Sequence, residues 1–346
     1  MSVAVLFGGS SYEHEISIVS AITMKKVFKS TDLEFIFLDA NREFYSIDSS
    51  DMKSKFFSSG DYKKAKRLSL KSGGFYSKTF FGENLIEFDT LLNLIHGRDG
   101  EDGKVASLME FYGINYISPR IEASNLSYSK LYTKLFAKEL GIEVVEYQHL
   151  FKHSPRVINI KYPLIIKPTR LGSSIGVSIV REKAHLEYAL DVAFELDDSV
   201  IIEPFIEGIK EYNLAGCKSN TWELSIIEEP QKDEFLDFDK KYMDFSRDSQ
   251  VAKADISLEL TKKLQESFKT IYEPIFYGSI IRCDFFVIDE RVILNEINPI
   301  PGSMANYLFE DFENMVLRLA NSLPKEKNIK IDYKYINSIS QAKGKA

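Results

Sequence analysis

Two short apolar runs, each ending in a glycine-containing turn before a helical pattern, constrain the fold of this chain most. The runs at 3–7 and 91–95 read as buried strands, and the turns at 8–13 and 96–103 follow them. Strand, turn and helix repeated in this order predict a parallel sheet covered by helices on both faces. Ligands of such open sheets bind at the carboxyl ends of the strands, where both turns lie.

Helical spacing of apolar residues predicts the helices. We expect a helix from about Glu15 and one cap, Ser257, at the start of another. The expected apolar faces comprise Ala21, Met24 and Phe28; Val105, Leu108, Met109 and Tyr112; Tyr132, Leu135, Phe136 and Leu140; Leu186, Leu190 and Ala193; and Leu260, Leu264, Phe268 and Ile271.

Beyond residue 124 the pattern changes to a mixture of helices and short strands. We therefore predict an N-terminal α/β domain (1–124), a central α+β domain (125–216) and a C-terminal domain (217–346). The further apolar runs that we expect as strands lie at 35–38, 164–167, 176–180, 200–203, 222–227, 280–288 and 292–298. Residues 41–85, rich in Lys and Ser, are expected to form an elaborated surface region.

The composition excludes several classes of protein. A net charge of -7 over 346 residues argues against a nucleic-acid binder, so clustered lysines are expected to serve a small anion. The two cysteines, Cys217 and Cys283, form no CxxC pattern, and we expect buried free thiols. No run of 18 apolar residues and no basic n-region occur, so we expect a cytoplasmic protein without a membrane partner.

The last two predicted strands carry a cluster of polar residues. Arg282 and Asp284 share one face of their strand, and Glu296 and Asn298 share one face of theirs, because side chains alternate along a strand. Two carboxylates and an amide oxygen are the hard ligands that Mg²⁺ prefers, and Arg282 offers a fork for phosphate. The alternative is a solvated sheet face with a surface ion pair.

The turn between these strands sets their register. If residues 289–291 form a three-residue loop, Ile288 lies opposite Val292. Counting along the strands, Asp284 then opposes Glu296, and all the polar side chains of the cluster meet on one face. The rigid turn that follows at 299–302 could aim the backbone N–H of Gly302 into the site.

A second candidate for anion binding is the loop at 168–175. Lys167 ends a buried strand, and the loop that follows holds two Gly and two Ser before the next strand. Such loops present backbone N–H groups and hydroxyls to an anion, although a surface hairpin is the alternative. The GxxxxGK[ST] pattern of a Walker A site is absent.

Two weaker signals concern the nucleotide. The apolar run 200–206 leaves its strand in an extended segment that could line an adenine slot, and Glu211 could take ribose hydroxyls. In isolation a plain strand exit is the simpler interpretation. A nicotinamide dehydrogenase is disfavoured because GxGxxG does not follow the first strand.

Taken in order, these motifs resemble the ATP-grasp superfamily, and specifically the D-alanine–D-alanine ligase family. The resemblance covers about residues 3–320 and implies three domains, with ATP held between the central and C-terminal ones. The motifs that carry it are Leu6-Phe7-Gly8-Gly9-Ser10-Ser11 with Glu13 and Glu15, His96-Gly97-Arg98-Asp99-Gly100-Glu101-Asp102-Gly103, Lys167-Pro168 with Gly172-Ser173-Ser174-Ile175-Gly176-Val177, Lys240-Lys241-Tyr242, Arg282-Cys283-Asp284 and Glu296-Ile297-Asn298.

The resemblance also implies an activity. Such a chain would join two D-alanines to D-alanyl-D-alanine through a D-alanyl phosphate, for peptidoglycan precursor synthesis. It would use ATP with two Mg²⁺ or Mn²⁺ ions and would form a homodimer. Residues 234–249 would form a lid that excludes water from the acyl phosphate.

Residue roles follow from the resemblance alone. The catalytic group would comprise Glu13, Ser173, Tyr242, Arg282 and Gly302, with the first three forming a hydrogen-bonded triad. Substrate would contact Glu13, His96, Lys241, Tyr242, Ser303 and Leu308. ATP would contact Lys130, Lys167, Ser174, Glu203, Phe205, Ile206, Glu211, Lys241 and Asn295. The metal ligands would be Asp284, Glu296 and Asn298.

Three departures from the family pattern are visible. The segment 303–308 lacks the serine near Tyr307 that usually contacts the second substrate's carboxylate; Ser303 or the backbone near Leu308 would replace it. Pro204 stands where a lysine is common, and residues 41–85 exceed the family core. The alternatives are another ATP-grasp carboxylate–amine ligase and a non-catalytic ATP-binding regulator, which should lack part of the metal and arginine set.

Overall fold

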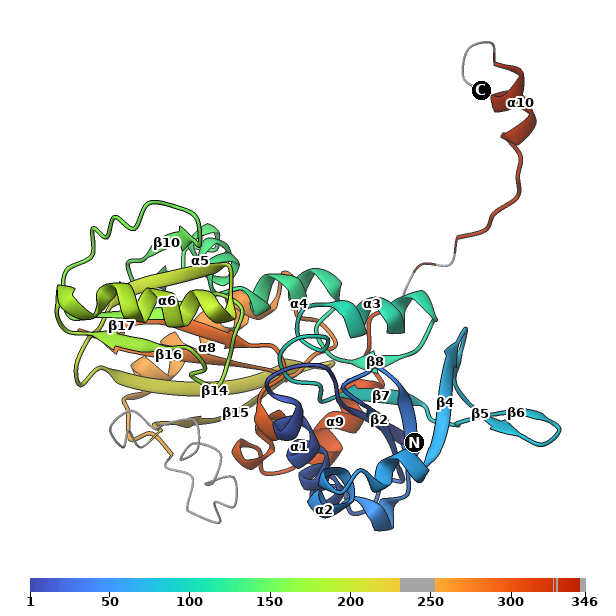
Figure 1. The fold of residues 1–346 in the computed structure, drawn as a ribbon. Helices are drawn as coiled ribbons and strands as arrows, with labels where there is room; N and C mark the ends of the chain where they lie inside the picture. Colours follow the sequence, from blue (N-terminus) through green and yellow to red (C-terminus); the bar gives the residue numbers. More distant parts are fainter. Residues whose placement is uncertain (231–252, 326, 328, 343–346) are drawn as a thin grey trace.

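Three β-sheets organise the chain (Figure 1). The computed structural model describes residues 1–230, 253–325, 327 and 329–342. Within these residues the strand orders are β6-β5-β4-β3-β2-β1-β7-β8, β10-β13-β11-β12 and β15-β14-β16-β17-β9. No helix in the described ranges is long and apolar enough to cross a membrane.

The first sheet is parallel at its centre, as the repeated strand–turn–helix pattern predicted. Strands β1, β2, β7 and β8 run parallel, and helices α1, α3 and α4 accompany them. The bounds are β1 (Val3–Gly8), β2 (Leu33–Leu38), β7 (Thr90–Asn93), β8 (Tyr116–Ile117), α1 (His14–Val27), α3 (Lys104–Phe111) and α4 (Ile121–Tyr128). The turn after β1 needs glycine, because Gly8 has φ +102 and a Cβ there would stand 2.1 Å from the Leu38 carbonyl oxygen.

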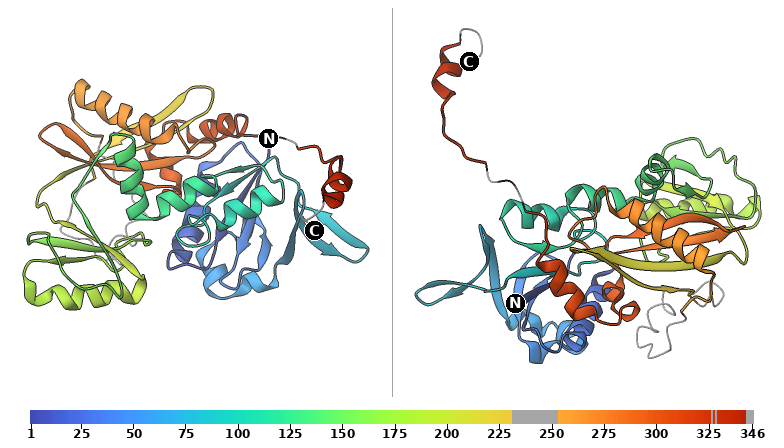
Figure 2. Two further views of the ribbon diagram at one scale, coloured as in Figure 1. Left: turned by 90° about the horizontal axis from the view of Figure 1, so that it is seen from above. Right: turned by 180° about the vertical axis from the view of Figure 1, so that it is seen from behind.

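Residues 41–85 are more than a surface region, which corrects our expectation. They add four antiparallel strands to the parallel sheet and bury Phe57, Leu68 and Phe75 in its cores. Their elements are β3 (Phe44–Ile47), α2 (Ser54–Ser58), β4 (Lys66–Lys71), β5 (Gly74–Thr79) and β6 (Gly82–Leu85). The distal end of the β5–β6 hairpin stands away from the body of the chain, as does the C-terminal helix α10 (Ile336–Gln341) (Figures 1 and 2).

The second sheet is antiparallel and carries helix α6 (Leu186–Leu196) on one face. Its strands are β10 (Gln148–Phe151), β11 (Leu164–Pro168), β12 (Ser178–Val180) and β13 (Ser199–Pro204). Leu186, Leu190 and Ala193 of the helix are buried against the sheet, so their predicted face is confirmed.

The third sheet holds the C-terminal strands and packs against α8 (Leu258–Tyr272). The side chain of Ser257 accepts a hydrogen bond from Leu260 N, which confirms the predicted cap. The strands of this sheet are β9 (Glu143–Val144), β14 (Lys210–Lys218), β15 (Trp222–Glu228), β16 (Ile281–Ile288) and β17 (Arg291–Asn298), and η4 (Gly302–Leu308) and α9 (Phe312–Ala320) follow them in the chain. Residue 216 lies within β14, and the division into three domains stays a prediction.

Helix α5 (Lys130–Glu139) turns only part of the predicted face inward: Phe136 and Leu140 are partly buried, and Phe136 packs against the core. Tyr132 is 50% exposed and Leu135 is 51% exposed, whereas Lys134 is only 2% exposed. Apolar spacing therefore described this helix only in part, because its buried side includes Thr133, Lys134 and Ala137, and Lys134 lies in an ion pair with Glu203. Leu108 of α3, at 38% exposed, likewise does not share the buried face predicted for it.

Candidate active site

Strands β16 and β17 bring four polar side chains onto one face of their sheet. Arg282 pairs with Asn298, and Asp284 pairs with Glu296, as predicted. The Arg282 guanidinium donates to both carboxylate oxygens of Asp284 (Nε to Oδ1 2.7 Å, Nη2 to Oδ2 2.9 Å), and Asn298 Nδ2 donates to Oδ2 at 2.9 Å. Burial raises the pKa of Asp284, and the guanidinium opposes that shift. Two carboxylates and an amide oxygen so close together fit a divalent cation such as Mg²⁺.

The turn that joins these strands differs from the predicted one. It comprises only residues 289 and 290, both left-handed (φ +48 and +59), so Ile288 pairs with Arg291 and not with Val292. A two-residue loop with two positive φ angles matches the right-handed twist of the strands. The expected carboxylate pair still forms because Asn295 is an extra residue in β17, and this bulge restores the register.

The carboxylate of Glu13 lies in a close-fitting pocket. Ser173 Oγ donates to Glu13 Oε1, and Glu13 N donates to Ser11 Oγ at 3.1 Å. A Cβ at Gly97 would stand 2.8 Å from Glu13 Oε2, and one at Gly172 would stand 3.0 Å from Oε1. Glycine at both positions therefore leaves just enough room for the carboxylate. Burial raises the pKa of Glu13, whose residue is 9% exposed.

Lys130 connects the glycine–serine loop to the cluster on the third sheet. Its Nζ donates to the carbonyl oxygen of Leu171 at 2.9 Å and lies 3.4 Å from Glu296 Oε2. Because Ser173 of the same loop contacts Glu13, one chain of contacts joins all three sheets. Residues predicted from three distant motifs thus lie around a common site.

Two lysines share the buried carboxylate of Glu203. Lys167 Nζ lies 2.7 Å from Oε2, and Lys134 Nζ lies 2.5 Å from Oε1. Burial opposes ionisation of Glu203, but the two ammonium groups outweigh it and lower its pKa to about 2. Lys167 Nζ also lies 3.5 Å from Asn295 Oδ1. Our sequence reasoning missed Lys134; the signal was its position four residues after Lys130 on one helix.

His96 joins the first sheet to the segment that follows β17. Its Nδ1 lies 2.9 Å from the Ile300 carbonyl oxygen, which can only accept, so Nδ1 carries the proton. Nε2 then accepts from Ser20 Oγ at 2.9 Å, and Ser20 Oγ accepts from Ser303 N at 3.0 Å. Both ring nitrogens of His96 therefore position the backbone of residues 300–303.

The backbone beside this network is strained. Ser303, Met304 and Ala305 have φ of +46, +54 and +50, a run of left-handed conformation that L-residues rarely adopt. Gly302 begins this turn, and Leu308 ends it with its side chain buried against Ala215 and Ala305. Leu308 can therefore offer only its backbone to a ligand, and its contact with substrate stays a prediction.

The other predicted nucleotide residues lie on the loop and strands near Glu203. Ser174 is exposed, with φ +59, and Phe205 N donates to the Pro163 carbonyl oxygen at 2.9 Å. Ile206 is partly exposed just beyond β13, and Glu211 lies on β14 opposite Phe286. Lys241, Tyr242 and the predicted lid at 234–249 lie outside the described residues.

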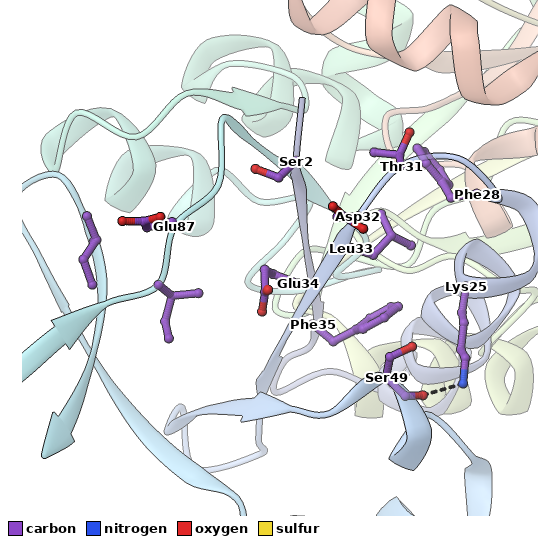
Figure 3. A pocket seen from close by; sticks show the side chains of 12 residues that line it. Ser2, Lys25, Phe28, Thr31, Asp32, Leu33, Glu34, Phe35, Ser49 and Glu87 are labelled. Carbon is purple, nitrogen blue, oxygen red and sulfur yellow. Dashed lines mark hydrogen bonds between the residues drawn. The ribbon is translucent and has the colours of Figure 1, made fainter.

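A separate hollow of about 760 Å³ lies away from these motifs (Figure 3). It opens at the amino ends of β1 and β2, between the end of α1 and the chain that leaves β6. Its lining includes Lys25, Phe28, Asp32, Glu34 and Glu87. Glu13 and His96 lie elsewhere, just beyond the opposite, carboxyl ends of β1 and β7, as expected for an open parallel sheet.

Comparison with known proteins identifies the relatives of the chain. The family model described as "D-ala D-ala ligase N-terminus" matches residues 2–119, and the one described as "D-ala D-ala ligase C-terminus" matches residues 136–315. The D-alanine–D-alanine ligase of Sulfurovum sp. (strain NBC37-1) is 67% identical, over 100% of both chains. That of Wolinella succinogenes is 59% identical, also over 100% of both chains.

A solved structure agrees with these sequences. The crystal structure of D-alanine–D-alanine ligase from Helicobacter pylori is similar with a TM-score of 0.84 and 50% identity, covering 94% of this chain and 100% of that one. Its match extends over all three sheets rather than over one domain. The chain belongs to the D-alanine–D-alanine ligase family, whose members have the ATP-grasp architecture.

Proposed function

We propose that this chain joins two molecules of D-alanine to D-alanyl-D-alanine while ATP is converted to ADP and phosphate. The observation that carries the proposal is the convergence of Glu13, Lys130, Lys167 and the Asp284–Glu296 pair around one loop. Family membership over the whole chain supports the same reaction. The dipeptide would serve as a peptidoglycan precursor.

The chemistry explains why these residue types gather. A carboxylate is a poor electrophile, and transfer of a phosphoryl group from ATP would convert it to D-alanyl phosphate. Lys130 and Lys167 would hold the nucleotide's phosphates. Divalent cations bound by Asp284, Glu296 and Asn298 would offset the charge of the phosphoryl group. Glu203, with Phe205, Ile206 and Glu211, would line the adenosine site.

The first sheet and the segment after β17 would hold the amino acids. Glu13, fixed by Ser173, would bind the ammonium group of the first D-alanine. The ammonium of the second would lose a proton before its nitrogen attacks the acyl phosphate. Arg282 and the N–H of Gly302 would stabilise the oxyanion of the tetrahedral intermediate, and phosphate would leave.

The metal ion, the oligomeric state and the cellular site of action are further parts of the proposal. Oxygen ligands favour Mg²⁺, with Mn²⁺ as the substitute, and titration of each metal into the protein with ATP would distinguish them. A homodimer is inferred from the family resemblance and is tested by sedimentation. ATP as co-substrate supports a cytoplasmic site of action, which cell fractionation tests.

The experiment is phosphate release by the purified chain with ATP, Mg²⁺ and D-alanine. L-alanine and D-serine are run in parallel, and each product is identified by mass. Release that requires D-alanine and gives the dipeptide is the expected result. A different product mass, or equal release with L-alanine, would refute the assignment of substrate.

Protection from heating separates the nucleotide from the substrate. ATP with Mg²⁺ is expected to raise the melting temperature, and NAD is not. Protection by ATP without release on any amino acid would favour a non-catalytic ATP-binding regulator. That alternative is already disfavoured, because Arg282, Asp284, Glu296 and Asn298 are all present and adjacent.

A further inference from the structure

Helix α5 buries a lysine in a place where an apolar side chain is usual. Lys134 is 2% exposed, whereas Tyr132 and Leu135 on the same helix face solvent. A buried ammonium group is costly unless a carboxylate compensates it. The compensating group is Glu203 of β13, also 2% exposed, so a buried charged pair links α5 to β13.

The pair is unusual because a second lysine occupies the other oxygen of the same carboxylate. Lys134 Nζ lies 2.5 Å from Oε1 and Lys167 Nζ lies 2.7 Å from Oε2. Two ammonium groups on one carboxylate leave one positive charge in excess. One of the two lysines can therefore leave Glu203 without exposing an unpaired carboxylate to the dry interior.

The surroundings decide which lysine leaves. Lys134 is enclosed, with its Nζ 5.6 Å from the centre of the Tyr147 ring. Lys167 is more exposed, and Asn295 Oδ1 lies 3.5 Å from its Nζ on the side of the third sheet, where Lys130 and Glu296 meet. A bound anion in the site would thus reach Lys167 and not Lys134.

We propose that Lys134 is a positioning residue that remains the counter-ion of Glu203, so that Lys167 can leave Glu203 and bind a phosphate of the nucleotide. The inference rests on the proposed ATP site. Glu203 stays ionised and in place for the adenosine when Lys167 moves, because Lys134 still pairs with it. Without Lys134, movement of Lys167 would leave the buried Glu203 carboxylate unpaired, so Lys167 would stay paired with Glu203.

The test compares nucleotide affinities of Lys134→Met with those of the full-length wild-type chain, without D-alanine. The variant keeps a one-to-one pair of Lys167 and Glu203, so we expect it to fold. The readout is the ratio of the adenosine Kd to the ATP Kd, which measures how much the phosphates contribute. That ratio is expected to fall by about tenfold or more. A purely structural role would weaken both ligands together and leave the ratio unchanged, which would overturn the proposal.

Three further variants sharpen the result. Lys138→Met removes a lysine one turn along the same helix, whose Nζ lies 4.4 Å from the Tyr147 ring centre, and should leave the ratio at the wild-type value. Lys134→Met combined with Glu203→Gln has no carboxylate to retain Lys167, so the ratio should recover. Glu203→Gln alone should also keep a high ratio, whether or not the methionine variant folds. A low ratio in either variant that carries Glu203→Gln would refute the proposed role of Lys134.

Failure of the inference is distinguishable from failure of the proposed function. A wild-type chain that binds ATP far better than adenosine but makes no dipeptide would contradict the ligase assignment only. A chain that makes the dipeptide and shows no change of ratio in Lys134→Met would contradict the role of Lys134 only.

Discussion

The hydrogen bond between Ser173 and Glu13 offers the most direct test of how the site is assembled. It joins the glycine–serine loop of the second sheet to the first turn of the chain, and its acceptor is buried. Ser173→Ala removes the donor and leaves a small side chain that fits the same space. The fold should survive, because Glu13 keeps its place between Gly97 and Gly172.

The magnitude follows from the type of bond. A hydrogen bond to a charged group contributes about 1.5–3 kcal/mol, and about 1.4 kcal/mol corresponds to a factor of ten in rate. If Glu13 must be held in place when the first D-alanine reacts, kcat/KM for D-alanine should fall roughly 10- to 150-fold. The substitution should weaken the reaction of D-alanine but not the binding of ATP. ATP with Mg²⁺ should therefore still raise the melting temperature of the variant.

The assay is phosphate release at varied D-alanine with saturating ATP. Ser219→Ala is the matched control. Ser219 lies in the turn between β14 and β15, and its Oγ also donates to a glutamate, Glu223 Oε1 of β15, at 3.5 Å. Its kcat/KM should equal that of the wild type. A Ser173→Ala variant within twofold of wild type would show that the bond is not maintained during the reaction.

Three further predictions concern the metal site, the turn between β16 and β17, and the hydrogen bonds of Glu313 to residues 29–31. Asp284→Asn should abolish the part of ATP's protection from heating that depends on Mg²⁺, and unchanged Mg²⁺ dependence would count against the metal site. Glu290→Gly should stabilise the chain by about 1 kcal/mol, because glycine adopts positive φ without cost; a melting temperature equal to or below that of wild type would contradict the two-residue turn. Glu313 accepts from Lys29 N, Ser30 N, Ser30 Oγ and Thr31 Oγ1, and although burial opposes it, these bonds lower the pKa of Glu313 from 4.5 to about 2. The ionised Glu313 carboxylate therefore stabilises the fold above pH 4.5, and this contribution is lost as the pH falls toward 2. Glu313→Gln should lower the free energy of unfolding by about 1–2 kcal/mol at pH 7. Denaturant titrations should show that the difference from wild type shrinks below pH 4.5. A difference that is constant down to pH 2 would refute this.

The sequence alone determined the local architecture and much of the candidate site. Parallel strands, most helix faces and the cap at Ser257 follow from periodicity and capping chemistry, which act over a few residues. Alternation along the strands placed Asp284 and Glu296 among the polar residues of one sheet face, although their pairing was predicted with a three-residue loop and holds because the bulge at Asn295 offsets the shorter turn. The motifs identified the family, because their order along the chain is itself part of the sequence.

Tertiary structure decided the rest. The bulge at Asn295 could not be predicted, since the two-residue turn and the extra residue have opposite effects on the register and only the packed sheet sets both. Residues 41–85 gained their strands from the edge of β2, which supplies the hydrogen-bonding partners. Lys134 is the clearest case: apolar spacing alone places a lysine outside, and only the carboxylate of Glu203, some seventy residues away in the chain, stabilises it inside.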